Sequence, residues 1–218
     1  MKQAPPKLIG SVLSRRDILK CLEKGDLTFT PNVEPSAIKQ CSVDLRLGKT
    51  FTVFNKPGHV AAFRIGQARA MFDLADLWEQ KQEEFVTLRP HHLVLAQTLE
   101  VVHLPNDLMG LIEGRSSWAR FGVGIHVTAP KIDPGYNQPI TLELFNLSET
   151  AYELEPEKDQ PCQLMLVRVS TPLKSDEMYG SLPGDFFADQ STPVPTRKIL
   201  SHGHPMAQKS PLLATVKS

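Results

Sequence analysis

The sequence predicts a mainly β protein with a few short helices, folded as a sandwich, a jelly roll or a distorted barrel. Residues 42–48 alternate strictly between polar and apolar side chains, which is the period of a β-strand. Further short runs of β-forming residues follow, and turn signals such as Asp133-Pro134-Gly135 separate them. No apolar run approaches the roughly 18 residues that would indicate a membrane-spanning helix.

The first element expected is a helix that begins after Ser14 and ends at Gly25. The Ser14 hydroxyl can accept a hydrogen bond from a free N–H group of the first turn, and Asp17 lies where the helix dipole is positive. Apolar side chains between residues 18 and 22 form one stripe, and Gly25 is a typical helix stop. Such a stripe indicates packing rather than function.

β-Forming residues dominate from Leu27 onward, with one helical interruption expected at residues 66–84. The expected strands after Leu27 cover residues 42–48, 50–54, 85–88, 93–104, 109–113, 140–147 and 162–170. Turns are expected at residues 89–90, 104–107 and 133–135, where Pro, Gly, Asn or Asp occur.

Composition limits the class of protein. Lys plus Arg and Asp plus Glu each number 24 in the 218 residues, and a net charge of zero argues against a non-specific nucleic-acid binder. The three cysteines, Cys21, Cys41 and Cys162, are odd in number and have no metal-ligand spacing, which favours a reduced, cytoplasmic compartment. The N-terminus lacks the apolar core of a signal peptide, so neither secretion nor a membrane partner is expected.

Residues 114–117, Gly-Arg-Ser-Ser, are a candidate anion site. They follow an apolar run and precede a helical turn, so free backbone N–H groups, two hydroxyls and the Arg115 guanidinium can converge there. A serine-capped helix with a surface arginine is the commoner explanation for these four residues alone.

Two carboxylates are further candidates. Asp133 lies in the 133–135 turn and can accept a hydrogen bond from a sugar hydroxyl, although closing its own turn is the commoner role. Glu143 lies in the middle of an expected strand between apolar neighbours. In a pocket it would suit proton shuttling, whereas an exposed strand glutamate is the simpler alternative.

His126 is expected to be a packed or hydrogen-bonded histidine and not the catalytic base. Zinc-dependent nucleobase deaminases carry H-x-E and P-C-x-x-C motifs. The sequence has no H-x-E, and Pro161-Cys162 is not followed by the second cysteine, so any deamination is expected to proceed without zinc.

Taken together, the motifs resemble the dCTP deaminase family of the dUTPase-like superfamily, over roughly residues 8–198. Each motif alone is weakly specific, but their order along the chain is specific. The motifs that carry the resemblance are residues 16–18 with Gly25, 41–48, 104–108, 114–117, 126–129, 132–135 and 141–143, and Gln190 with Pro193, Pro195 and Arg197.

The resemblance implies a dUTPase-like distorted β-barrel or jelly roll that forms a homotrimer, with active sites between subunits. The substrate would be dCTP, with Mg²⁺ bound through its triphosphate. The implied domain covers residues 1–198, including a mobile closing tail at about 175–198, and residues 199–218 are expected to be disordered.

The resemblance also implies roles for individual residues. The expected catalytic residues are Glu143 as general base, Arg120 close to it, and Ser116. The expected substrate-binding residues are Arg115, Ser116 and Ser117 for the triphosphate, Asp133 for the 3′-hydroxyl, His126, Val127, Thr128 and Ala129 around the base, Lys131, and Tyr179 and Gln190 from the closing tail.

The leading expectation is therefore hydrolysis of dCTP to dUTP and ammonia, for the supply of pyrimidine deoxynucleotides. A bifunctional enzyme that yields dUMP and pyrophosphate is the alternative, and a non-catalytic nucleotide-binding trimer is the second. A plain dUTPase is disfavoured because the C-terminal segment lacks the Gly-rich, Arg-containing closing motif of that group.

Several positions depart from the family pattern. Pro130-Lys131, Gln138, Phe186 and Ser191 replace commoner residues, and Phe186 stands where a lysine often contacts phosphate. The turn at residues 156–162 is one residue longer than usual. These departures concern the closing tail and the substrate preference more than the core reaction.

Overall fold

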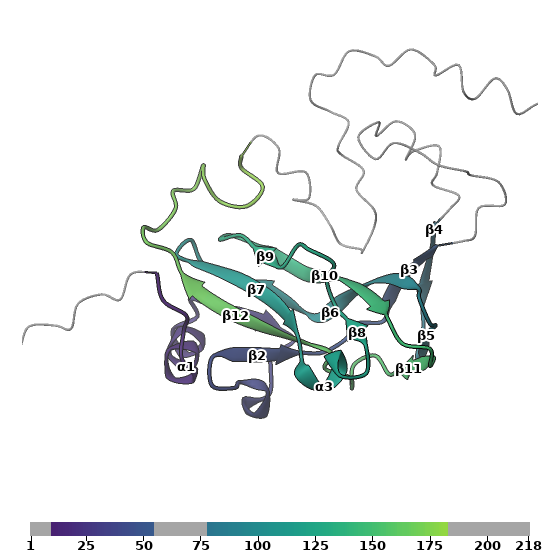
Figure 1. The fold of residues 1–218 in the computed structure, drawn as a ribbon. Helices are drawn as coiled ribbons and strands as arrows, with labels where there is room; N and C mark the ends of the chain where they lie inside the picture. Colours follow the sequence, from purple (N-terminus) through teal and green to yellow (C-terminus); the bar gives the residue numbers. More distant parts are fainter. Residues whose placement is uncertain (1–9, 55–77, 183–218) are drawn as a thin grey trace, which may run out of the picture.

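The computed structural model describes residues 10–54 and 78–182 and is built mostly from antiparallel strands (Figure 1). Its described helices are short: α1 (Arg15–Lys24), the 3₁₀ turn η1 (Pro35–Ala37) and α3 (Ser116–Ala119). The prediction of a mainly β fold with a few short helices is confirmed. No helix within the described ranges has both the length and the apolar character needed to cross a membrane.

The strands form two larger sheets and one small one. The first sheet has the order β4-β3-β6-β10-β8, with β1 paired to β6, the second has the order β2-β12-β7-β9, and β11 pairs with β5. The strands are β1 (Thr28–Thr30), β2 (Ser42–Leu45), β3 (Thr50–Phe54), β4 (Trp78–Gln82), β5 (Val86–Leu88), β6 (Leu93–His103), β7 (Leu108–Gly114), β8 (Val123–Gly124), β9 (Lys131–Ile132), β10 (Asn137–Asn146), β11 (Tyr152–Leu154) and β12 (Cys162–Arg168). The predicted strands and the three predicted turns are present.

The expected helix at residues 66–84 is wrong where it can be compared. Residues 66–77 lie outside the described residues, and β4 occupies 78–82 as a strand. β4 pairs antiparallel with β3, with Thr50 opposite Gln82 and Phe54 opposite Trp78. Backbone pairing with a neighbouring strand therefore overrides the local helical preference of this segment.

The N-terminal helix α1 has the predicted ends. The Asp17 N–H donates to the Ser14 hydroxyl over 3.4 Å, and Gly25 takes the left-handed conformation, with φ 75°, in which glycine is favoured. Ile18 and Cys21 face inward, and α1 lies beside the end of β12 (Figure 1), where the Leu13 N–H donates to the Leu166 carbonyl. The helix is a packing element, as predicted.

A single apolar core joins the two larger sheets. The alternation of burial along β10 places Leu142 and Leu144 in this core and leaves Glu143 half-buried on the other face. Both faces of β2 are covered, so Ser42 and Asp44 are buried at 4% and 2% exposure, together with the apolar residues that alternate with them. The largest fully buried side chains include Phe51, Ile18, Leu27, Leu45, Leu47, Leu88, Leu104, Leu108, Ile112, Ile125, Ile140 and Leu142.

The three cysteines differ in burial, so their thiols are expected to differ in reactivity. Cys21 and Cys162 are buried, and burial raises the pKa of both thiols, whereas Cys41 is exposed. Because the thiolate is the reactive form, we expect one rapidly reacting thiol in the native protein at about pH 8, and all three after unfolding. Ellman's reagent measures this directly. Cys41→Ser should remove the rapid phase, and a rapid phase that persists in this variant would contradict the fold.

Candidate functional site

The predicted anion segment lies where β7 ends and α3 begins. Arg115 is the N-cap residue of α3 and makes no side-chain cap, and Ser116 and Ser117 are exposed in the first turn. The helical turn predicted after Gly114 is therefore present, but neither serine caps it.

Arg115 is not a free surface arginine. Its Nε lies 3.3 Å from Oδ2 of Asp44, and its Nη1 donates to the Gln160 carbonyl over 3.0 Å. The Arg115 backbone N–H donates to the Pro161 carbonyl over 3.0 Å. The guanidinium is thus held between β2 and the loop before β12.

Glu143 is half-buried on β10 and contacts the segment that follows β8. Its backbone N–H donates to the Ile125 carbonyl over 2.9 Å, and its Oε2 accepts the Val127 N–H over 2.7 Å. The carboxylate therefore has a defined orientation against the backbone that was expected to shape the base pocket. An exposed strand glutamate, the simpler alternative, does not describe this position.

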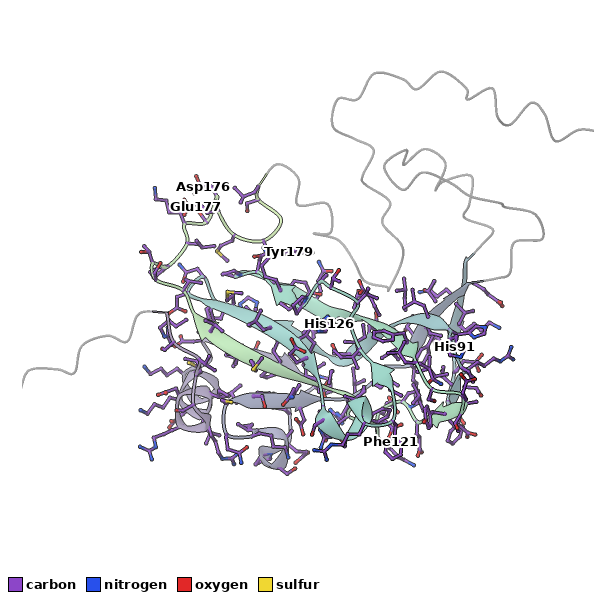
Figure 2. The ribbon with its side chains drawn as sticks, in the orientation of Figure 1. His91, Phe121, His126, Asp176, Glu177 and Tyr179 are labelled. Atoms are coloured by element: carbon purple, nitrogen blue, oxygen red, sulfur yellow. The ribbon has the colours of Figure 1, made fainter. Side chains whose placement is uncertain are left out.

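His126 is a hydrogen-bonded histidine, as predicted. Its Nε2 lies 3.2 Å from Oε2 of Glu113 on β7, while its Nδ1 is buried without a hydrogen-bond partner in the described part of the chain (Figure 2). Carboxylates from the two larger sheets therefore hold consecutive residues, because Glu113 contacts His126 and Glu143 contacts Val127. Sequence reasoning missed Glu113, since a separation of 13 residues gives no sign of this contact.

Asp133 lies in the predicted turn after β9. Its carbonyl accepts the Tyr136 N–H over 3.2 Å, and Gly135 has φ 86°, a conformation that glycine adopts without strain. The Asp133 carboxylate lies 2.8 Å from Nζ of Lys131, so both predicted substrate-binding residues belong to one ion pair. The side chain is therefore oriented by Lys131.

The segment that holds Tyr179 docks on the same turn. The Tyr179 N–H donates to the Pro134 carbonyl over 2.9 Å, and the Tyr179 ring lies 5.0 Å from the Tyr136 ring, measured between centroids (Figure 2). The start of the predicted closing tail is thus next to Asp133. Gln190, Phe186, Ser191 and the expected disordered stretch 199–218 lie outside the described residues.

Arg120 is linked to Ser116, because the Arg120 N–H donates to the Ser116 carbonyl over 3.1 Å. Across residues 10–54 and 78–182, no hydrogen bond or ion pair links Arg120 to Glu143, although the two were expected to lie close together. Much of the predicted site is exposed to solvent in the single chain. The exposed members are Ser116, Ser117, Arg120, Val127, Thr128, Ala129 and Lys131.

The fold is one that a solved structure shares. The structure is similar to that of the 2′-deoxycytidine 5′-triphosphate deaminase from Agrobacterium tumefaciens, with a TM-score of 0.56 and 17% sequence identity. The match covers 73% of this chain and 49% of that chain. The predicted dUTPase-like β fold is confirmed.

The sequence comparisons identify the family. The model of the dCTP deaminase-like family matches residues 12–169, and the chain belongs to this family. One relative, the "dCTP deaminase, dUMP-forming" of Corynebacterium kroppenstedtii, is 36% identical over 87% of this chain and 98% of its own length. Another of the same name, from Acidothermus cellulolyticus, is 39% identical over 85% of this chain and 94% of its own length.

These relatives correct the expected product. The leading expectation was a deaminase that releases dUTP, in a route of dUTP biosynthesis. The relatives at 36–39% identity are named as dUMP-forming, which overturns that expectation and favours the bifunctional alternative.

Proposed function

We propose that the protein hydrolyses dCTP to dUMP, ammonia and pyrophosphate, with the consumption of two water molecules. The observation that carries this proposal is the similarity to dUMP-forming dCTP deaminases over nearly their whole length. One water replaces the amino group at C4 of cytosine. The other cleaves the bond between the α-phosphate and the β-phosphate, which leaves dUMP and pyrophosphate.

Glu143 is the proposed general base of the deamination. It takes a proton from water as the water oxygen attacks C4, and it returns the proton to the amino group as the C4–N bond breaks and ammonia leaves. The hydrogen bond from the Val127 N–H supports this role, because it fixes one carboxylate oxygen and leaves the second for the water. We place Arg120 and Ser116 beside the cytosine ring and Glu143.

Arg115, Ser116 and Ser117 are the proposed triphosphate site. A guanidinium held on one side by Asp44 and the Gln160 carbonyl can offer its remaining N–H groups to phosphate oxygens, and two exposed hydroxyls follow it in the chain. Mg²⁺ would enter on the triphosphate and neutralise part of its charge.

The sugar and base have separate proposed contacts. Asp133, oriented by Lys131, accepts the 3′-hydroxyl hydrogen bond, and the backbone of residues 126–129 surrounds the base. Tyr179 and Gln190 are the proposed contacts from the C-terminal segment, and the hydrogen bond from the Tyr179 N–H to the Pro134 carbonyl supports the assignment of Tyr179. Because the cysteine pattern favours a reduced compartment, we place this reaction in the cytoplasm.

A homotrimer with active sites between subunits completes the proposal. Phe121, next to the proposed site, and Val127, within it, are exposed at 63% and 56% in the single chain, and large exposed apolar side chains favour an interface. Light scattering is expected to give three times the chain mass of 24.3 kDa. A protein that is monomeric under the assay conditions and still turns over dCTP would contradict an active site formed between subunits.

The activity is tested by incubation of the purified protein with dCTP and Mg²⁺, followed by ion-exchange separation of the nucleotides. The expected nucleotide product is dUMP. Accumulation of dUTP as the end product would contradict the bifunctional proposal, and unchanged dCTP with tight nucleotide binding would favour a non-catalytic trimer.

A further inference from the structure

We propose that Asp44 is a positioning residue that orients the Arg115 guanidinium for the triphosphate. This inference rests on the proposed function of the site. Asp44 lies on β2, 71 positions before Arg115 in the chain, and its side chain is 2% exposed. Its Oδ2 lies 3.3 Å from Nε of Arg115, so the carboxylate reaches the guanidinium from below the surface on which Ser116 and Ser117 are exposed.

Two contacts restrain the Arg115 guanidinium. Asp44 forms an ion pair with Nε that is not a hydrogen bond, and the Gln160 carbonyl accepts a hydrogen bond from Nη1 over 3.0 Å. Together they restrict the rotation of the planar group and favour one direction for its other N–H groups. Such preorganisation lowers the cost of ordering a flexible arginine when the phosphate binds.

The surroundings of Asp44 indicate that this carboxylate has a role beyond packing. Its Oδ2 is buried without a hydrogen bond within the described ranges, and its charge is balanced by Arg115 and by Lys39, whose Nζ lies 3.6 Å away. A buried carboxylate is costly unless it is paired, and a buried pair contributes little net stability. Orientation of Arg115 is the function that this geometry provides.

β7, the strand that directly precedes Arg115, is held in place as well. The Ser42 hydroxyl donates to Oε1 of Gln163, and Nε2 of Gln163 donates to the Gly114 carbonyl over 3.2 Å. β2, β12 and β7 are therefore linked through side chains directly before Arg115. A shift of Asp44 relative to Arg115 would require these contacts to change together.

An orienting role of Asp44 and a purely electrostatic role predict opposite changes in the KM for dCTP in the Asp44→Asn variant. Removal of a negative charge beside the triphosphate site would strengthen anion binding if charge alone mattered. If Asp44 orients Arg115, the amide holds the guanidinium less firmly and the binding of the triphosphate weakens. The sign of the change in KM therefore distinguishes the two.

The first experiment compares steady-state kinetics of the full-length wild-type protein and Asp44→Asn with dCTP and Mg²⁺. We expect KM to rise about tenfold, which corresponds to a weaker charge-assisted hydrogen bond from Arg115 to the phosphate, while kcat changes by less than about threefold. Asp107→Asn is the matched control, because it removes the partner of Arg168 on the same sheet, away from Arg115. Its KM is expected to match that of the wild type.

A double-mutant cycle shows whether Asp44 acts through Arg115. In the Arg115→Gln background, Asp44→Asn should cause no further rise in KM, whereas independent effects would multiply. An unchanged or lowered KM in Asp44→Asn, or multiplicative effects in the double variant, would overturn the proposal. Turnover of dCTP by the wild type tests the proposed function separately from the comparison of the variants.

Arg115→Lys covers the case in which Asp44→Asn does not fold. Lysine keeps the charge but cannot contact Asp44, the Gln160 carbonyl and a phosphate with one planar group. We expect its KM to rise by at least about tenfold with kcat little changed. A wild-type KM in this folded variant would overturn the proposed positioning.

Discussion

Replacement of Glu143 by Gln is expected to reduce the turnover of dCTP by about a thousandfold, because general-base catalysis contributes a factor of about 10² to 10⁴. The amide cannot take a proton from water, yet its oxygen can still accept the Val127 N–H that Glu143 accepts over 2.7 Å. The local backbone should therefore keep its arrangement. Binding of dCTP, measured by calorimetry, is expected to stay within about threefold of the wild type.

Glu153→Gln is the matched control for this experiment. Glu153 is an exposed strand glutamate on β11, a strand that carries none of the proposed site residues, so its substitution makes the same chemical change outside the site. Wild-type turnover is expected for this variant. Ammonia release by Glu143→Gln at a rate near that of the wild type would show that another group activates the water.

Replacement of Asp133 by Ala is expected to raise KM for dCTP by about ten- to a hundredfold, the loss of a hydrogen bond to a charged group. The test is most specific with 2′,3′-dideoxycytidine triphosphate as a second substrate. The wild-type protein should discriminate against this analogue, which lacks the 3′-hydroxyl, whereas the variant should treat the two nucleotides alike. Discrimination that survives in the variant would assign the 3′-hydroxyl to another residue.

Asp176→Ala is the matched control for the Asp133 experiment. Asp176 is an exposed aspartate in the segment before Tyr179 (Figure 2), so its substitution removes a carboxylate close in sequence to the docked segment but outside the 133–135 turn. It should leave discrimination between the two nucleotides unchanged. A loss of discrimination in both variants would indicate a general electrostatic effect in place of a direct contact.

Local sequence signals predicted much of the fold. The ends of α1 follow from Ser14 and Gly25, because capping depends on residues within one turn of the helix. The strand period likewise puts Leu142 and Leu144 on one face and Glu143 on the other, and the structure buries the face of the two leucines. The helix expected over residues 78–82 was wrong, because the conformation of this segment depends on pairing with β3, which lies more than 20 residues earlier in the chain.

The candidate site shows the same limit. The residues around 114–117, 126–129, 133 and 143 could be singled out as motifs, but their partners could not. Asp44 and Glu113 contact Arg115 and His126 only because separate strands bring them together. No periodicity or spacing in a single sequence reports such contacts.

The product could not be predicted from Glu143, the proposed general base. Glu143 and its strand indicate chemistry at the base, and the residues that would bind the triphosphate serve either product. Whether the bond between the α- and β-phosphates is also cleaved depends on the placement of a second water. Neither the motif at 141–143 nor the segment at 114–117 encodes that placement in a recognisable pattern.

The most direct test of the central claim is the ratio of pyrophosphate to ammonia released from dCTP alone during the first turnovers. A parallel reaction follows the label of base-labelled dCTP in the presence of excess unlabelled dUTP. The bifunctional account predicts equal amounts of the two products in the first reaction and label in dUMP in the second, because both bonds break before the nucleotide leaves. Ammonia without pyrophosphate, together with label that collects in dUTP, would contradict it.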